Sequence, residues 1–143
     1  MKKHGHLNRD VNRVLGCMGH TDSLVIADCG LPIPPGVECI DLSVTYGEPS
    51  FRRVLESVLL QMKVERAAFA SEARELNSTV AAIAAGLPAD GIQVEFIAHE
   101  TLKELSHQAH AVLRTGEATA YSNVILYSGV QFAAASPRSE PCA

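Results

Sequence analysis

The sequence lacks any apolar run that approaches the roughly 20 residues a membrane-spanning helix needs. It also lacks a basic stripe, and its formal net charge of −4 is unfavourable for binding nucleic acid. The charged N-terminus, residues 1–8, has no apolar core of the kind found in secretory signals. We therefore expect a cytoplasmic protein that has neither a membrane nor a nucleic acid as its partner.

Motifs for cofactor chemistry are absent as well. There is no G-x-G-x-x-G, no phosphate-binding Walker loop and no G-x-S-x-G around a nucleophilic serine. His107 and His110 lie three residues apart, and Cys17 precedes His20 by three, but neither pair has further ligands at the spacing of a zinc site. The sequence thus predicts no metal and no cofactor. Its four cysteines, Cys142 among them, are expected to be reduced thiols.

What is present is the composition of an ordinary globular domain, with 47% apolar and 20% charged residues over 143 positions. The spacing of the apolar residues predicts helices that alternate with strands. We expect helices over residues 7–18, 47–59, 71–85 and 99–108, and strands over 23–28, 39–44, 62–70, 92–98, 111–115 and 123–127. The segment 62–70 also fits the start of a helix, but a strand is favoured there.

Alternating strands and helices indicate an α/β fold. We expect a single-domain, Rossmann-like three-layer sandwich with a largely parallel or mixed central sheet. Residues 1–132 would form this domain. Residues 133–143 are small and polar and contain two prolines, so we expect them to be a disordered tail.

The most informative segment runs from Gly19 to Pro34. It places His20 and Asp28 at the two ends of a short, very apolar run, which predicts a buried strand, and a stiff proline-rich loop follows at once. Titratable side chains at the ends of a buried strand are typical of small-molecule sites. Each residue also has a plainer interpretation, because His20 can be structural and Asp28 can cap the loop through backbone amides.

Two further groups of polar residues lie beside predicted strands. His99 and Lys103 are four residues apart on one face of a predicted helix, which could equally be a solvated face. Tyr121, Ser122 and Asn123 come directly before the last strand, where they could bind sugar hydroxyls or simply form a polar loop. Taken together with His20 and Asp28, these side chains suit a small polyhydroxylated ligand and proton transfer without a cofactor.

A series of segments in this order resembles the D-ribose pyranase family, the sugar mutarotases that include the L-fucose mutarotases. The resemblance spans residues 1–132, and its Gly-His-Thr-Asp and Asp-x-Gly-Leu-Pro-Ile-Pro motifs are those of the ribose branch. Its segments are Met1–Lys3, Leu7–Asn8, Gly19–Pro34, Gly47–Phe51, Met62–Glu65, His99–Glu100, Arg114–Glu117, Tyr121–Asn123 and Gly129–Phe132. Cys29 and Ser122 depart from the pattern, in which alanine or another small residue is usual.

The resemblance implies an isomerase that interconverts the β-pyranose and β-furanose forms of D-ribose, with residues 1–132 as its catalytic domain. It implies that His20 is the catalytic proton donor. It also implies that Asp28, His99, Lys103 and the stretch Tyr121, Ser122 and Asn123 bind the sugar. Family members form homo-oligomers, described as decamers of two stacked pentameric rings, and need no metal.

The length of the first strand raises a geometric problem for such a site. From Ser23 to Asp28 an extended chain covers roughly 16 Å. His20 and Asp28 of one chain therefore cannot easily touch one sugar, and we expect the site to join two subunits. The alternatives left open are a mutarotase for another sugar such as L-fucose, a non-catalytic sugar-binding module, and a thiol or zinc hydrolase.

Overall fold

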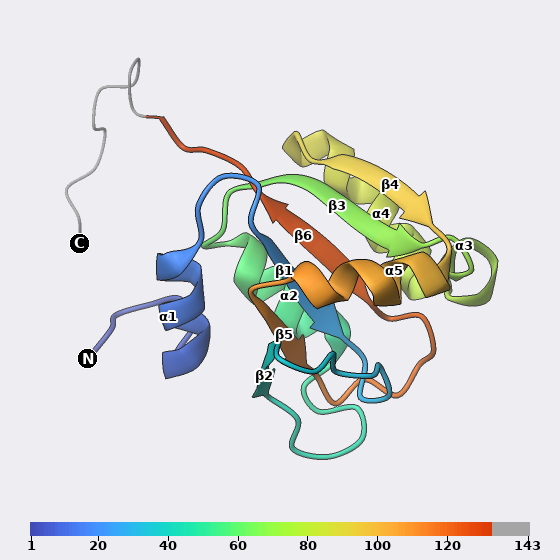
Figure 1. Ribbon diagram of the computed structural model, residues 1–143, viewed down its shortest axis with the longest axis horizontal. Helices are drawn as coiled ribbons and strands as arrows, with labels where there is room; N and C mark the ends of the chain where they lie inside the picture. Colours follow the sequence, from blue (N-terminus) through green and yellow to red (C-terminus); the bar gives the residue numbers. More distant parts are fainter. Residues whose placement is uncertain (133–143) are drawn as a thin grey trace.

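The buried strand β1 (Ser23–Ala27) lies in the interior of a six-stranded sheet with the order β2-β5-β1-β6-β3-β4 (Figure 1). The computed structural model describes residues 1–132, so the predicted disordered tail, 133–143, lies outside the described residues. The other elements are α1 (Arg9–Cys17), β2 (Glu38–Asp41), α2 (Phe51–Leu59), β3 (Val64–Ala70), α3 (Ala73–Leu76), α4 (Ser78–Gly86), the 3-10 helix η1 (Leu87–Asp90), β4 (Gln93–Ile97), α5 (His99–Leu105), the 3-10 helix η2 (Ser106–Gln108), β5 (Ala111–Arg114) and β6 (Val124–Ser128).

The sheet is mixed. β6 runs antiparallel to its neighbours β1 and β3, whereas the pairs β1–β5, β2–β5 and β3–β4 are parallel. The carboxyl ends of every strand except β6 therefore gather at one rim of the sheet, together with the start of β6. We call this the carboxyl rim and the opposite one the amino rim. Ligands of open α/β sheets bind at the carboxyl rim.

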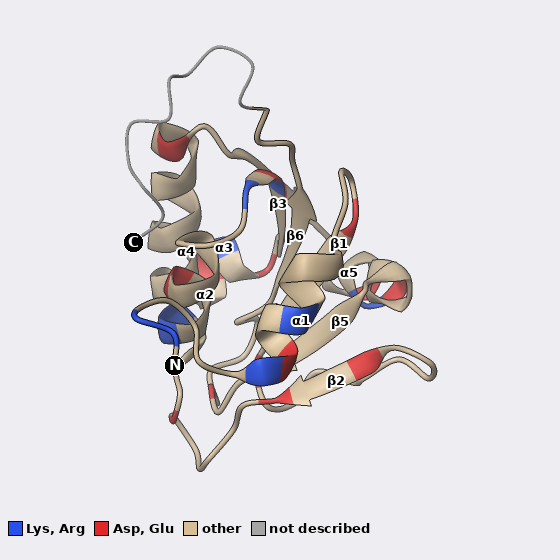
Figure 2. Cartoon of the chain, turned by 90° about the vertical axis from the view of Figure 1, so that its left-hand side faces the viewer, with Lys and Arg blue, Asp and Glu red and all other residues tan. Residues whose placement is uncertain are grey.

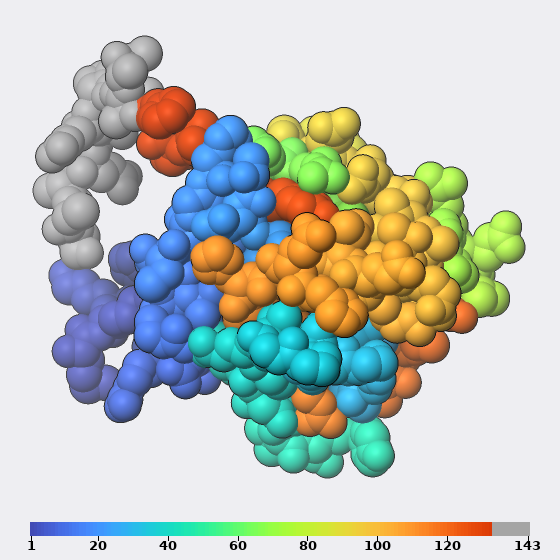
Figure 3. All heavy atoms as spheres, in the orientation of Figure 1, coloured from blue at the N-terminus to red at the C-terminus, as the bar shows by residue number. Residues whose placement is uncertain are grey.

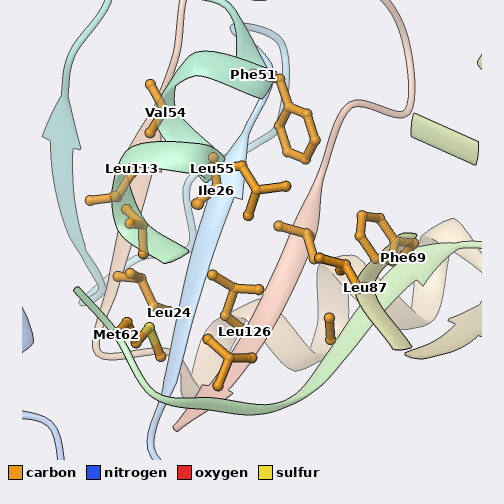
Figure 4. Packing of buried hydrophobic residues seen from close by; sticks show 14 of the residues in the cluster. Leu24, Ile26, Phe51, Val54, Leu55, Met62, Phe69, Leu87, Leu113 and Leu126 are labelled. Carbon is orange, nitrogen blue, oxygen red and sulfur yellow. The ribbon is translucent and has the colours of Figure 1, made fainter. Parts of the chain in front are cut away.

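Helices cover both faces of the sheet. Successive side chains of β1 point to opposite faces, and all of them are buried, so both faces must be covered. Leu24 and Ile26 belong to the core cluster that includes apolar residues of α1, α2 and α4, and Figure 4 shows part of this cluster. Val25 and Ala27 face Leu102 of α5, a helix on the other side of the sheet (Figure 1). All five of these side chains are fully buried. Burial of a valine or leucine side chain contributes about 1.5–3 kcal/mol, so this strand anchors both layers of the core. The predicted α/β fold with three layers and a mixed sheet is confirmed.

The helix beginnings follow from their capping residues. The Asn8 side chain accepts hydrogen bonds from the backbone N–H groups of Asp10 and Val11 and so begins α1. The Ser50 hydroxyl accepts the N–H of Arg53 and begins α2. The segment that fitted both a helix and a strand, 62–70, is confirmed as the strand β3.

The single helix predicted over residues 71–85 is wrong, because the chain there forms two helices. Asn77 takes extended backbone angles between α3 and α4, and its Oδ1 accepts the N–H of Val80. Asparagine favours such a capping position over a helix interior because its side chain competes for backbone hydrogen bonds. The amide nitrogen of Asn77 donates to the Ala120 carbonyl and the Ser122 hydroxyl, so the break also anchors the loop before β6.

Smaller differences concern lengths. β2 ends at Asp41, three residues before the predicted end, and the helix predicted over 99–108 finishes as the 3-10 turn η2. No helix within residues 1–132 is long and apolar enough to cross a membrane. Lysine and arginine are interspersed with aspartate and glutamate along the chain (Figure 2).

Candidate functional site

A pocket of about 570 Å³ opens at the carboxyl rim. Residues 28–32 after β1, residues 117–121 before β6, and the side chains of Tyr46, His99 and Lys103 form its walls. In the space-filling view the light-blue and cyan segment that follows β1 lies against orange α5 on this face of the molecule (Figure 3). The sheet topology thus brings together segments that are distant in the sequence, and four of the predicted site residues meet here: Asp28, His99, Lys103 and Tyr121.

Asp28 is held in place by two neighbours. Its Oδ1 accepts the N–H of Gly30 at 3.0 Å, and its Oδ2 accepts the amide Nδ2 of Asn123 at 3.0 Å. Burial raises the pKa of the Asp28 carboxyl, and this effect outweighs the opposing hydrogen bonds from Gly30, Asn123 and Leu31 and the attraction of His99. A fixed carboxylate of this kind can accept hydrogen bonds from sugar hydroxyls.

His99 begins α5 at the end of β4. Its backbone N–H donates to the Glu72 carboxylate, 3.0 Å from Oε2, which fixes the first turn of the helix. The imidazole meets the ring of Tyr121 edge-on, with the centroids 5.2 Å apart. Its buried Nδ1 has no hydrogen-bond partner among the described residues. A buried polar atom without a partner is costly, and this one belongs to a side chain that lines the pocket.

Lys103 follows His99 by one helical turn, on the face of α5 that the spacing of four predicted for both, and it lines the same pocket. Its ammonium group pairs with Glu100 at 2.7 Å. A lysine so placed can donate hydrogen bonds to hydroxyl or ring oxygens of a sugar.

The three residues before β6, Tyr121–Asn123, differ in where their side chains lie relative to the pocket. Tyr121 lines the pocket and has a positive φ of 63°, in the left-handed region that costs a non-glycine residue about 1–3 kcal/mol. Ser122 is 2% exposed and accepts a hydrogen bond from Asn77, behind the pocket wall. Asn123 is fully buried, and both ends of its amide contact Asp28. The structure therefore places Tyr121 at the pocket surface and the side chains of Ser122 and Asn123 behind it.

His20 lies outside this pocket, at the amino rim. It precedes β1, whereas Asp28 follows β1, and the strand between them covers roughly 16 Å from Ser23 to Asp28. Its imidazole is 51% exposed and its Nε2 lies 2.9 Å from Oε2 of Glu65. One chain therefore does not bring His20 and the pocket residues together.

Among the pocket-lining residues that sequence reasoning did not single out are two with titratable side chains, Tyr46 and Glu117. The carboxylate of Glu117 accepts the N–H of Phe51 at the start of α2, and its carbonyl accepts the N–H of Cys29. Tyr46 comes from the turn between β2 and α2, which packs so closely on Gly116 that a Cβ there would lie 2.3 Å from the Glu48 carbonyl oxygen. Such a close backbone approach demands glycine, but it cannot be deduced from a lone glycine in a sequence.

The histidines that were weighed as metal ligands have separate partners. His110 lies 3.4 Å from the Asp22 carboxylate, and the ring of His107 contacts the Lys103 carbonyl. Within residues 1–132, no group of three or more histidine, cysteine, aspartate or glutamate side chains is arranged to hold a metal ion. Cys17, Cys29 and Cys39 are free thiols.

A mixed α/β sheet with a polar pocket at the carboxyl ends of its strands defines a small-molecule-binding α/β protein. The chain belongs to the RbsD / FucU transport protein family, whose model matches residues 1–131. It is 57% identical to a D-ribose pyranase of Chromobacterium violaceum and 52% identical to one of Halalkalibacterium halodurans, each match covering 92% of this chain and 100% of the relative.

Solved structures agree with this assignment. The structure of Bacillus subtilis RbsD complexed with D-ribose superimposes with a TM-score of 0.88 at 43% identity, covering 92% of this chain and 100% of that one. The fucose mutarotase of Streptococcus pneumoniae in complex with L-fucose has a TM-score of 0.74 at 24% identity, covering 87% of this chain and 94% of that one, and so shares the fold.

Proposed function

We propose that this protein interconverts the β-pyranose and β-furanose forms of D-ribose. The observation that carries the proposal is the pocket in which Asp28, His99, Lys103 and Tyr121 meet. The high identity to proteins named D-ribose pyranase, and the likeness to RbsD complexed with D-ribose, support ribose as the sugar. The likeness to a fucose mutarotase is more distant, so we propose ribose rather than fucose.

The reaction moves protons and requires no redox step. A base removes the proton of the anomeric hydroxyl and, now protonated, returns it as an acid to the ring oxygen, which opens the hemiacetal to the aldehyde. Closure on a different hydroxyl reverses these roles. A positioned histidine can serve as either acid or base, and such proton transfer typically contributes about 10²–10⁴-fold to the rate.

In this proposal the pocket residues hold the sugar and His20 exchanges the protons. Asp28 accepts hydrogen bonds from hydroxyls, and Lys103 donates to oxygens. The ring of Tyr121 packs on His99 and helps to fix the imidazole beside the sugar. Asn123 acts from behind by orienting Asp28, and Ser122 anchors the loop through Asn77.

His20 reaches the sugar from a neighbouring copy of the chain. The position of His20 at the amino rim, across β1 from the pocket, supports this division of the site. A ring of copies would place the amino rim of each subunit beside the carboxyl rim of the next, and we propose a decamer of two stacked pentameric rings. We place the reaction in the cytoplasm, since a reducing compartment suits the exposed thiols of Cys17 and Cys39.

The direct test is magnetisation-exchange NMR on equilibrated sugar. Added protein should accelerate exchange between ribose pyranose and furanose signals far above the rate in buffer, and more than it accelerates exchange in L-fucose. Faster exchange in fucose would transfer the proposal to that sugar. Binding of ribose without any acceleration would identify a sugar-binding module instead.

A further inference from the structure

Glu65 is the residue that contacts the His20 imidazole, although the two lie 45 positions apart in the sequence. Glu65 is the second residue of β3, and His20 precedes β1, so both side chains belong to the amino rim. The carboxylate Oε2 and the ring Nε2 are 2.9 Å apart. Glu65 does not line the sugar pocket of its own chain.

The backbone around His20 is fixed independently of this contact. The N–H of Thr21 donates to the Ser128 carbonyl at 2.8 Å, and the N–H of Ser128 donates to the Asp22 carbonyl at 2.8 Å. The Asp22 carboxylate accepts the N–H of Gly19 at 2.7 Å. Thr21 has a φ of +72°, which a non-glycine residue adopts only where its surroundings enforce it. These bonds set where the turn lies, and the Glu65 contact sets how the ring is rotated.

An ionised carboxylate can only accept a hydrogen bond, so the ring nitrogen that faces it must carry the hydrogen. We propose that Glu65 is a positioning residue that holds neutral His20 with its proton on Nε2 and leaves Nδ1 as the atom that exchanges protons with the sugar. This inference rests on the function proposed above. It follows the logic by which a carboxylate fixes the tautomer of a catalytic histidine in other enzymes.

The exposure of the pair argues for orientation rather than for stability. Both side chains are about half exposed, at 51% and 43%, and ion pairs at the surface contribute little to folding. Such a contact can still set how the imidazole ring is turned and which of its two nitrogens carries the hydrogen. Replacement of Glu65 should therefore change turnover more than it changes the melting temperature.

The experiment compares the full-length wild type with Glu65→Gln, using protein labelled with ¹⁵N in its histidine rings and His20→Ala to assign the His20 signals. In the wild type we expect the neutral His20 ring, observed at alkaline pH, to carry its proton on Nε2. The glutamine amide can donate as well as accept, so E65Q should show a mixture of the two tautomers. Its kcat for ribose should fall by about tenfold or more with KM nearly unchanged, compared with roughly 10⁴-fold for the equivalent change in a buried catalytic triad.

Glu95→Gln is the matched control, because Glu95 is a similarly exposed glutamate on the neighbouring strand and pairs with Arg66. It should leave both the His20 tautomer and kcat at wild-type values. Protonation at Nδ1 in an active wild type, or an E65Q protein with unchanged kcat, overturns the role of Glu65. A wild type that fails to accelerate ribose exchange overturns the proposed function itself, and with it the role of Nδ1.

Discussion

Asn123 and Asp28 are joined by two hydrogen bonds that run in opposite directions. The backbone N–H of Asp28 donates to Oδ1 of Asn123 at 2.9 Å, and Nδ2 of Asn123 donates to Oδ2 of Asp28 at 3.0 Å. The start of β6 thereby orients the carboxylate that follows β1. Asn123 is fully buried and does not line the pocket, so its effect on a sugar must pass through Asp28.

We predict that Asn123→Ala raises KM for ribose roughly tenfold, the equivalent of losing one charge-assisted hydrogen bond that orients Asp28. It should also lower the free energy of unfolding by about 1–3 kcal/mol, because the N–H of Asp28 is left without an acceptor. Saturation kinetics by exchange NMR and thermal unfolding measure the two effects. Asn8→Ala, which removes only the cap of α1, should lower stability by about 0.5–2 kcal/mol and leave KM unchanged. Equal KM values in the two variants would contradict the role of Asn123.

Protonation of the Asp28 carboxyl should set the pH below which the affinity for ribose is lost. Because burial raises the pKa of the Asp28 carboxyl, this group takes up its proton at a higher pH than an ordinary aspartate does. Ribose affinity should thus be full above this raised pKa and fall as the pH drops through it. The stability of the wild type relative to Asp28→Asn should change in the opposite sense, falling as the pH rises through the same pKa. Calorimetric titration with ribose across acidic pH checks the first trend, and an affinity that is flat down to the ordinary aspartate range would refute it.

Gly116→Ala should change the shape of the pocket by displacing a neighbouring turn. The added Cβ would lie 2.3 Å from the Glu48 carbonyl oxygen and 2.4 Å from that of Thr45, so the turn that carries Tyr46 must move. We expect a loss of about 1–3 kcal/mol in stability together with weaker ribose binding.

Gly16→Ala is the control for this glycine substitution. Gly16 lies in α1 with no neighbouring atom within 4 Å of the added Cβ, so the change should stabilise the protein by about 0.5–1 kcal/mol without affecting ribose. If both variants bound ribose like the wild type, the close approach at Gly116 would have no bearing on the pocket.

Residues 1–132 should be sufficient for activity, since the curated relatives align with 132 residues over their whole length. A protein that ends at Phe132 should retain kcat within twofold of the full chain. A tenfold loss would assign residues 133–143 a part in the reaction.

The sequence was enough to predict elements whose signal is local. The alternation of strands with helices predicted an α/β fold with a largely parallel or mixed sheet, and the observed topology carries Asp28 and His99 to the same rim. The break at Asn77 was not predicted, because the apolar spacing continues across it and only the capping bond to Val80 decides for two helices. Local propensity gives way here to a side-chain hydrogen bond.

The pocket itself was predicted only in part. Glu117 and Tyr46 reach it through contacts between distant loops, which leave no periodic pattern in the sequence. The sequence placed Asn123 with Asp28 among the expected sugar-binding residues, but no pattern could show that its amide turns inward to bind Asp28. The distance between His20 and Asp28, by contrast, followed from strand geometry alone, because five extended residues cannot be folded back within a sheet.

The shared site is tested most directly by mixing two disabled variants. His20→Ala and Asp28→Ala are purified separately, shown to be inactive alone, then unfolded and refolded together so that mixed assemblies form. If each site combines His20 of one copy with the pocket of another, random mixing of equal amounts restores about one quarter of the wild-type rate of ribose exchange. Mixed assemblies that are verified by mass and remain as inactive as their parents would contradict a site completed between copies.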